Sequence, residues 1–270
     1  MATKRGAVSK RAVESVARSI ADVKAVITSL GDDEWGRQSG CEGWTVKDLL
    51  AHMSSNYHEV VSPSPPPAEP INLPAERLMD LLVEPRKAWT NEQVRDEYLT
   101  CCDGALATLT ALQDEPLAST VIPIADLGSY PMHELADAFA FDHYCHLHVD
   151  LLAPTGPIDR QLPPVDDALI APAIGWMLTG IPQMQPGLEH RLTGRIRLAL
   201  TGPGAGTWDI NREGDSIVIG PPSGDADATV TSSAHAFVLW GTVRSPWRDH
   251  CRIDGDEAAA AAFLDALNIV

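Results

Sequence analysis

The sequence predicts an α+β protein in two parts, an N-terminal antiparallel four-helix bundle followed by a small C-terminal α+β domain. Apolar residues recur every three or four positions through most of residues 13–152, which is the period of helices that bury one face. Residues 153–164, rich in Pro and Gly, interrupt this pattern. Short segments with strand character and turn residues then alternate with helical ones. We therefore expect one domain at residues 1–156 and another at residues 165–270.

Four main helices and one short helix account for the first half of the chain. Capping boxes, in which a side chain and a backbone group three residues apart bond reciprocally, predict where two of them begin: Thr45 pairs with Asp48, and Thr90 with Gln93. The expected helices cover residues 13–30, 46–60, 74–87, 91–112 and 130–152. In the second half we expect helices at 166–180, 233–243 and 257–267, and strands at 195–200, 207–210, 216–220, 228–231 and 251–253.

The helix expected over Tyr130–Leu152 carries the polar residues of greatest interest. Its inward-facing stripe includes Asp142 and His146, which lie four residues apart and therefore on one face. A lone buried charge is costly, so these side chains must be paired, hydrogen-bonded or bound to a metal. His52 borders the apolar side of an earlier helix and is either an ordinary bundle residue or a ligand.

Two histidines and one carboxylate match the three protein ligands that catalytic zinc takes while keeping one position open. His52, Asp142 and His146 are therefore the candidate metal ligands, and a soft thiolate would suit the open position. The residues alone allow a second interpretation equally well. In it, Asp142 and His146 form a buried hydrogen-bonded pair that fixes helix packing.

The composition restricts the class of partner. The net charge of −17 argues against nucleic acid and against an anionic membrane surface, because both require a basic protein face. No signal peptide or membrane span is evident, and the five cysteines show no paired zinc spacing. We expect a cytoplasmic, monomeric protein with reduced thiols. Arg244 and Arg248 form the local basic cluster of the second half, as either solvated surface or an anion-binding pair facing the bundle site.

The segment CEGWTVKDLLAHM, residues 41–53, resembles the start of the second helix in the mycothiol-dependent maleylpyruvate isomerase family. The matching positions are Gly43, Trp44, Thr45, Val46, Asp48 and His52. The later segment FDHYCHLHVDLL is similar to the family's second metal motif. Here Asp142 stands where the best-known isomerases carry Glu, and Asp150 follows His146 by four residues instead of three. IDGDEAAAAAFLDAL near the C-terminus resembles an attached sterol-carrier-type domain.

This resemblance implies a DinB-like bundle that holds a zinc-type divalent metal on His52, Asp142 and His146. It also implies a low-molecular-weight thiol, mycothiol in actinobacteria, as cosubstrate. The bound thiolate would attack a small electrophile, giving isomerisation if the thiol leaves again and transfer if it stays. We expect Arg244 to act in catalysis and Arg244 with Arg248 to bind the thiol cofactor. The alternatives are a non-catalytic protein carrying an apolar ligand in its C-terminal domain, and a purely structural bundle.

Overall fold

The computed structural model describes residues 5–65 and 73–269. Contacts divide the chain into two compact units, one formed by residues up to 126 together with 130–164, the other by residues 127–129 together with 165–270. The assignment of separate domains at residues 1–156 and 165–270 stays a prediction. The basic start of the chain, residues 1–4, on which the expected lack of a signal peptide partly rests, lies outside the described residues.

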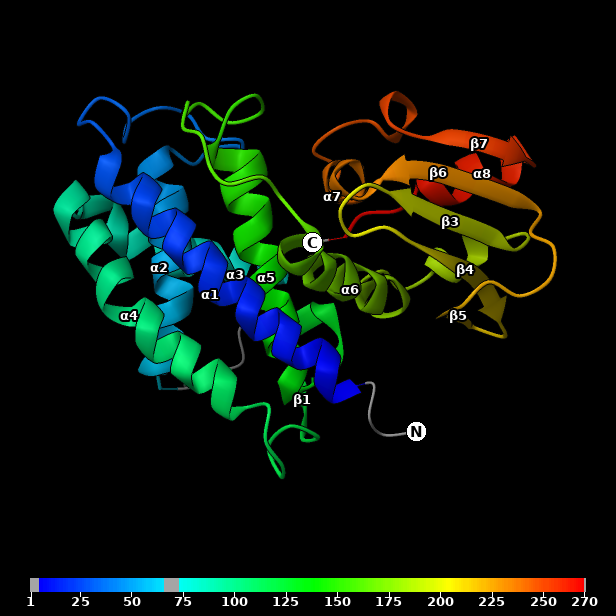
Figure 1. Ribbon diagram of the computed structural model, residues 1–270, viewed down its shortest axis with the longest axis horizontal. Helices are drawn as coiled ribbons and strands as arrows, with labels where there is room; N and C mark the ends of the chain where they lie inside the picture. Colours follow the sequence, from blue (N-terminus) through cyan, green and yellow to red (C-terminus); the bar gives the residue numbers. More distant parts are fainter. Residues whose placement is uncertain (1–4, 66–72, 270) are drawn as a thin grey trace. The chain divides into compact units, whose positions relative to one another are not determined.

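The first unit is a helical bundle. Its long helices are α1 (Arg5–Ser29), α2 (Val46–Val61), α4 (Asn91–Ala111) and α5 (Leu135–Cys145), which run beside one another in Figure 1. A short helix, α3 (Ala75–Val83), continues into the 3-10 helix η1 (Glu84–Ala88). The bundle buries a continuous apolar core, to which α1 contributes Val16, Ile20, Val23 and Ile27.

Both predicted capping boxes are confirmed. The Thr45 side chain accepts a hydrogen bond from the Asp48 backbone N–H, and the Asp48 carboxylate accepts one from the Thr45 N–H, so α2 begins at Val46. Thr90 and Gln93 make the same reciprocal pair at the start of α4. These bonds satisfy backbone donors that the first turn of a helix leaves without partners. The beginning of α2 in turn fixes the position of His52, two turns further on.

The helix predicted over Tyr130–Leu152 is shorter and less regular than expected. Tyr130 and Pro131 belong to strand β2 (Ser129–Pro131), which pairs with β1 (Val121–Pro123). The residue before a proline is driven into extended conformations, which keeps Tyr130 out of the helix. Two 3-10 helices, η2 (Ala125–Leu127) and η3 (Met132–Glu134), flank β2. At its C-terminal end α5 passes into the π-helix η4 (His146–Leu151).

The most deeply buried face of α5 lies one residue beyond the predicted inward stripe, which runs through Leu135, Phe139, Asp142 and His146. Ala136, Ala140, His143 and Leu147 are fully buried, whereas Leu135, Phe139 and Asp142 are half-buried. His143 packs against Tyr57 of α2, with ring centroids 4.6 Å apart. The predicted stripe therefore borders the core and is partly open to solvent, as an accessible site requires.

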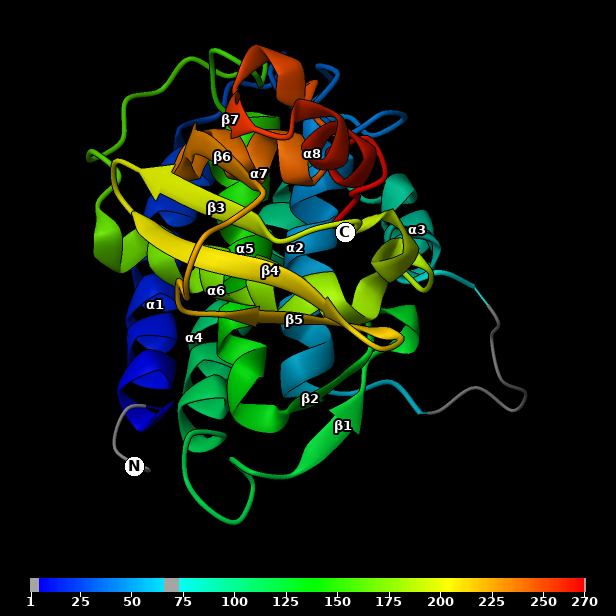
Figure 2. The same cartoon turned by 90° about the vertical axis from the view of Figure 1, so that its right-hand side faces the viewer.

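The second unit combines helices with a mixed five-stranded sheet. Its elements are α6 (Asp167–Met184), η5 (Leu188–Arg191), β3 (Ile196–Thr201), β4 (Gly206–Glu213), β5 (Ser216–Gly220), β6 (Ala228–Ser233), α7 (Ala234–Gly241), η6 (Trp247–Asp249), β7 (Arg252–Gly255) and α8 (Glu257–Leu264). The strand order is β5-β4-β3-β6-β7. Only β3 and β6 pair in parallel; the other neighbours are antiparallel. Figure 2 shows α6 and α7 behind this sheet.

These elements confirm the predicted α+β class, a helical bundle followed by a sheet with helices. The strands expected at 207–210 and 216–220 lie within β4 and β5, which pair as an antiparallel hairpin. The strand expected at 251–253 was too short: Asp254 and Gly255 extend β7 and pair with Thr229 and Ala228 of β6. Backbone pairing to a neighbouring strand outweighs the turn preference of the Asp-Gly dipeptide. Within residues 5–65 and 73–269, no helix has the length and apolarity needed to cross a bilayer.

Candidate metal centre

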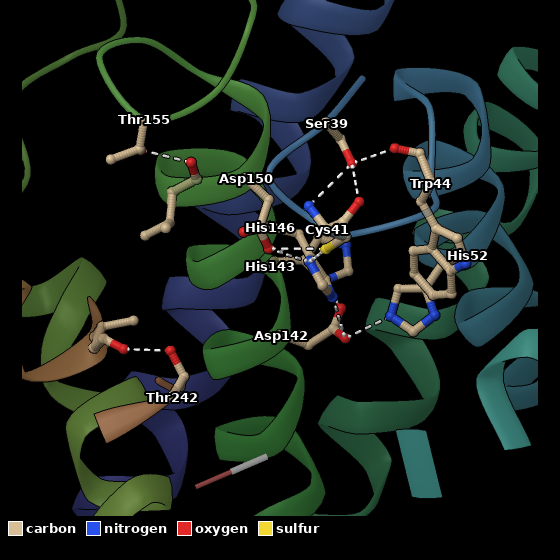
Figure 3. A network of polar contacts seen from close by, with 12 residues as sticks. Ser39, Cys41, Trp44, His52, Asp142, His143, His146, Asp150, Thr155 and Thr242 are labelled. Atoms are coloured by element: carbon tan, nitrogen blue, oxygen red, sulfur yellow. Dashed lines mark hydrogen bonds and ion pairs between the residues drawn. The ribbon is translucent and has the colours of Figure 1, made fainter. Parts of the chain in front are cut away.

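Three predicted ligands converge between α2 and the end of α5. The Nε2 atom of His52 lies 3.0 Å from Oδ1 of Asp142, and Nε2 of His146 lies 3.5 Å from the same oxygen. One ligand atom from each of the three residues can be chosen so that all lie within 4.8 Å of one another. Figure 3 shows the imidazole of His52 directed at Asp142 from the facing helix. A tetrahedral zinc ion separates its nitrogen and oxygen ligands by about 3.3–3.5 Å, so this arrangement can hold a metal.

The electrostatics of the three residues suit a cation. Burial by itself raises the pKa of Asp142, but the neighbouring imidazoles of His146 and His52 outweigh it and hold this pKa well below the ordinary value. Burial lowers the pKa of His146, against the opposing effects of Asp142 and Asp150. These shifts favour an ionised carboxylate and a neutral imidazole, the forms that bind a metal.

Asp150 supports His146 from the other side of the ring. Its Oδ2 lies 2.8 Å from His146 Nδ1, and its side chain is 1% exposed. An ionised carboxylate can only accept a hydrogen bond, so Nδ1 carries the proton and Nε2 presents a lone pair to the site. This is the outer contact that usually orients a metal-binding histidine.

The loop before α2 brings a thiol to the same place. Cys41 Sγ lies 3.3 Å from Asp150 Oδ2 and 3.8 Å from His146 Nδ1. The backbone N–H of Gly40 donates to the Asp150 carbonyl at 2.8 Å. A Cβ atom at Gly40 would lie 2.7 Å from the Asp150 Cα, so only glycine permits this approach. In Figure 3 the sulfur of Cys41 stands beside His146 and Asp150.

Asn56 and Trp44 lie beside the predicted metal ligands His52 and Asp142. The Asn56 amide nitrogen lies 3.3 Å from His52 Nε2 and 3.4 Å from Asp142 Oδ1, one helical turn after His52. The indole of Trp44 packs beside the His52 ring, with centroids 5.1 Å apart, and its N–H donates to Asp80. A half-buried amide and an aromatic wall thus border the ligand atoms.

Asp150 follows His146 by four residues within the π-helix η4. Residues four apart share a face in a regular α-helix, and in this π-helix Asp150 also lies beside the His146 ring. The bond from the Leu152 N–H to the Leu147 carbonyl, five residues back, shows the wider turn. Within this wider turn Asp150 faces the His146 ring.

Three residues at this site were not among the predicted ligands: Cys41, Asn56 and Asp150. A partial signal exists for two of them, because Asn56 follows His52 and Asp150 follows His146 by one turn. Cys41 comes from a loop, and periodicity says nothing about where a loop side chain points.

The two predicted arginines lie in the second unit. Val243 takes the left-handed conformation at φ 58°, and the Arg244 N–H donates to the Leu239 carbonyl at 2.9 Å, which closes the end of α7. Arg248 forms a two-pronged ion pair with Asp265 and stacks over Trp247. Roles of Arg244 in catalysis and of either arginine in cofactor binding stay predictions.

Comparison with known families identifies the bundle. Residues 16–148 match the family described as "Mycothiol maleylpyruvate isomerase N-terminal domain". The bundle belongs to this family. Its matched span contains His52, Asp142 and His146, so the candidate metal centre lies within the family domain. Comparison with curated proteins yields no match.

Solved structures of a mycothiol-dependent maleylpyruvate isomerase share the fold of most of this chain. The crystal structure of that enzyme covers 91% of this chain and 92% of its own, with a TM-score of 0.58 and 14% sequence identity. A histidine-to-alanine mutant of that enzyme covers the same shares, with a TM-score of 0.56 and 13% identity. At such identity the similarity shows the fold alone: a helical bundle joined to a mixed sheet with helices.

Proposed function

We propose that the protein is a metal- and mycothiol-dependent enzyme that uses a bound thiolate to attack a small electrophile. The observation that supports this function is the convergence of His52, Asp142 and His146, two imidazoles and one carboxylate, in a bundle of this family. The resident ion is a zinc-type divalent metal. The substrate is an activated double bond or an epoxide, and the reaction is isomerisation or thiol transfer.

The donor set fits such an ion. Its nitrogen and oxygen atoms are separated by 3.0 and 3.5 Å, near the ligand spacing of tetrahedral zinc. Three protein ligands leave one position for a thiol, and when bound, the metal supplies the positive charge that deprotonates a coordinating thiol. His52 and His146 would each bind through Nε2, and Asp142 through Oδ1.

The remaining residues orient and shield the reacting groups. Asp150 keeps the proton on His146 Nδ1 and so holds the ring in its binding orientation. The Asn56 amide, next to two ligand atoms, can donate a hydrogen bond to a substrate oxygen placed beside the thiolate. Trp44 limits the access of water on the side of His52. If the thiol is expelled after the electrophile has rotated, the product is an isomer, and if it stays, the product is a thioether.

The cofactor also needs recognition beyond its sulfur. A thiol cofactor or substrate with carboxylates requires a local cation on a chain whose net charge is −17. We assign this role to Arg244 because its planar guanidinium suits a carboxylate and it follows directly on the rigid end of α7. Arg248 belongs to the same turn, where a ligand has to compete with Asp265 for its guanidinium.

Calorimetric titration with mycothiol tests the proposed function. Zinc-loaded wild-type protein should bind the thiol, whereas metal-free protein and the His52→Ala variant should not. His190→Ala is the matched control, since His190 has a side chain 62% exposed and lies in the second unit. Equal affinity of the metal-free and zinc-loaded proteins would exclude a metal-bound thiolate.

A further inference from the structure

His146 takes part in two clusters of metal-binding side chains, one at each ring nitrogen. Its Nε2 faces Asp142 and His52, as described above. Its Nδ1 faces Asp150 Oδ2 at 2.8 Å and Cys41 Sγ at 3.8 Å, while the sulfur and the carboxylate oxygen lie 3.3 Å apart. Ligand atoms of Cys41, His146 and Asp150 all lie within 4.8 Å of one another. The proposed function uses only the cluster at Nε2 and assigns no role to the Cys41 thiol.

The second cluster has the dimensions and the chemistry of a zinc-type site. With Zn–S bonds of about 2.3 Å and Zn–N or Zn–O bonds of about 2.1 Å, tetrahedral geometry separates ligand atoms by about 3.4–3.6 Å. The observed separations of 2.8, 3.3 and 3.8 Å bracket this range. A thiolate with an imidazole selects soft or borderline cations such as zinc over magnesium or calcium.

The backbone around Cys41 is held in place before any ion arrives. The Gln38 amide donates to the Cys41 carbonyl at 2.7 Å, and the Cys41 N–H donates to Ser39 Oγ at 3.2 Å. The bond from the Gly40 N–H to the Asp150 carbonyl ties this loop to the π-helix. A cysteine held in this way loses little conformational freedom on binding an ion, which favours affinity.

We propose that Cys41, His146 and Asp150 form a second metal site for a zinc-type ion, sharing His146 with the first site. Binding would release the proton of the Cys41 thiol to solvent, and Asp150 would exchange its hydrogen bond for a metal bond. When the first site is empty, the His146 proton would move from Nδ1 to Nε2, so that one proton leaves in all. When Nε2 already holds the first ion, the Nδ1 proton would leave to solvent as well. The fourth position of the second ion is open to water.

The competing explanation is that this cluster only orients His146 through hydrogen bonds. The two explanations differ in the state of the sulfur, because a metal ligand is a thiolate bonded to the ion and a hydrogen-bond donor is a thiol. Cobalt(II) distinguishes them, since a thiolate ligand produces an intense charge-transfer absorption in the near ultraviolet. The His52→Ala variant removes a ligand of the first site and leaves all three residues of the second.

The experiment is a cobalt(II) titration of metal-free, full-length protein under reducing conditions. The wild type and His52→Ala should both show the charge-transfer absorption, and Cys41→Ser should lose it. Cys251→Ser, which alters another half-buried thiol in the other unit, should retain it. Absence of the absorption from both the wild type and His52→Ala would overturn the proposal, and so would its persistence in Cys41→Ser.

Alkylation of Cys41 provides a second readout that does not depend on an altered cysteine. In the His52→Ala protein, saturating zinc should slow iodoacetamide labelling of Cys41 at least tenfold, as measured by peptide mass spectrometry. Asp150→Asn in the same background should abolish most of this protection. An unchanged labelling rate with zinc would show that the cluster is a hydrogen-bonded support only. Because His52 is absent in these proteins, the outcome is independent of the proposed thiol chemistry.

Discussion

Asp150 Oδ2 accepts a hydrogen bond of 2.8 Å from His146 Nδ1, and this contact determines which nitrogen of His146 faces Asp142. Without it, either ring nitrogen of a neutral imidazole could carry the proton. Only the tautomer protonated at Nδ1 presents a lone pair from Nε2 to the site. Asp150 lies four residues after His146 in the π-helix η4, with its carboxylate beside the ring. An outer carboxylate therefore prepares His146 for metal binding.

Replacing Asp150 should weaken the first metal site without touching its ligands. In a Cys41→Ser background, which leaves only the first site, we expect Asp150→Asn to reduce zinc affinity about 10- to 100-fold, as for other outer-shell carboxylates. Competition with a chromophoric chelator measures the affinity. Asp159→Asn, an exposed carboxylate of the same unit, is the control. Wild-type affinity in Asp150→Asn would show that His146 is oriented by other contacts.

Gly40 should tolerate no side chain. In Gly40→Ala the new Cβ would meet the Asp150 Cα at 2.7 Å and Oδ1 at 2.8 Å, so the loop or the π-helix must shift. We expect a loss of about 1–3 kcal/mol in the free energy of unfolding, measured with urea, together with weaker zinc binding. Gly36→Ala is the matched control in the same loop, because nothing lies within 4 Å of a Cβ there. Equal stability of the two variants would contradict the close packing of this loop on Asp150.

The sequence predicted the framework of the site better than its completion. Thr45 and Thr90 predict where their helices begin, because a capping box needs only residues close in the sequence. The period of the apolar residues predicts that the helix faces bearing His52 and Asp142 meet. Cys41 could not be placed in this way, because its position depends on a loop docked by Gly40 on a distant segment. The apolar period also did not predict the π-helix η4, because it assumes regular α-helical spacing through Asp150.

The buried carboxylate of Asp137 should make stability depend on pH. Burial, assisted by the charge of Glu134, raises the pKa of Asp137 to about 8, so the folded protein keeps a proton that the unfolded chain releases above about pH 4. Its contribution to stability is therefore complete below about pH 4 and is lost as the pH rises to about 8. In urea unfolding, Asp137→Asn should gain stability over the wild type across this range.

Asp32→Asn, at an exposed carboxylate of the same unit, serves as the control for Asp137 and should follow the wild-type pH dependence. If Asp137→Asn and the wild type keep a constant difference from pH 4 to pH 8, Asp137 is ionised in the folded protein and its raised pKa is wrong.

Arg244 should contribute to thiol binding through charge. We expect Arg244→Ala to weaken mycothiol binding by about 1–3 kcal/mol, as for loss of a charge-assisted hydrogen bond, with the zinc content unchanged. Arg252→Ala is the control, because Arg252 is an exposed arginine of the same unit that pairs with Asp254. Titration calorimetry and metal analysis measure the two quantities. Wild-type binding by Arg244→Ala would make this arginine an ordinary surface residue.

Anomalous X-ray diffraction at the zinc edge tests whether His52, Asp142 and His146 hold a zinc-type metal. Crystals of zinc-loaded protein should show an anomalous peak about 2.0–2.2 Å from His52 Nε2, Asp142 Oδ1 and His146 Nε2. The peak should vanish in His52→Ala crystals, while any peak beside Cys41 should remain. Zinc-loaded crystals without an anomalous peak between these three atoms would show that His52, Asp142 and His146 do not hold the metal.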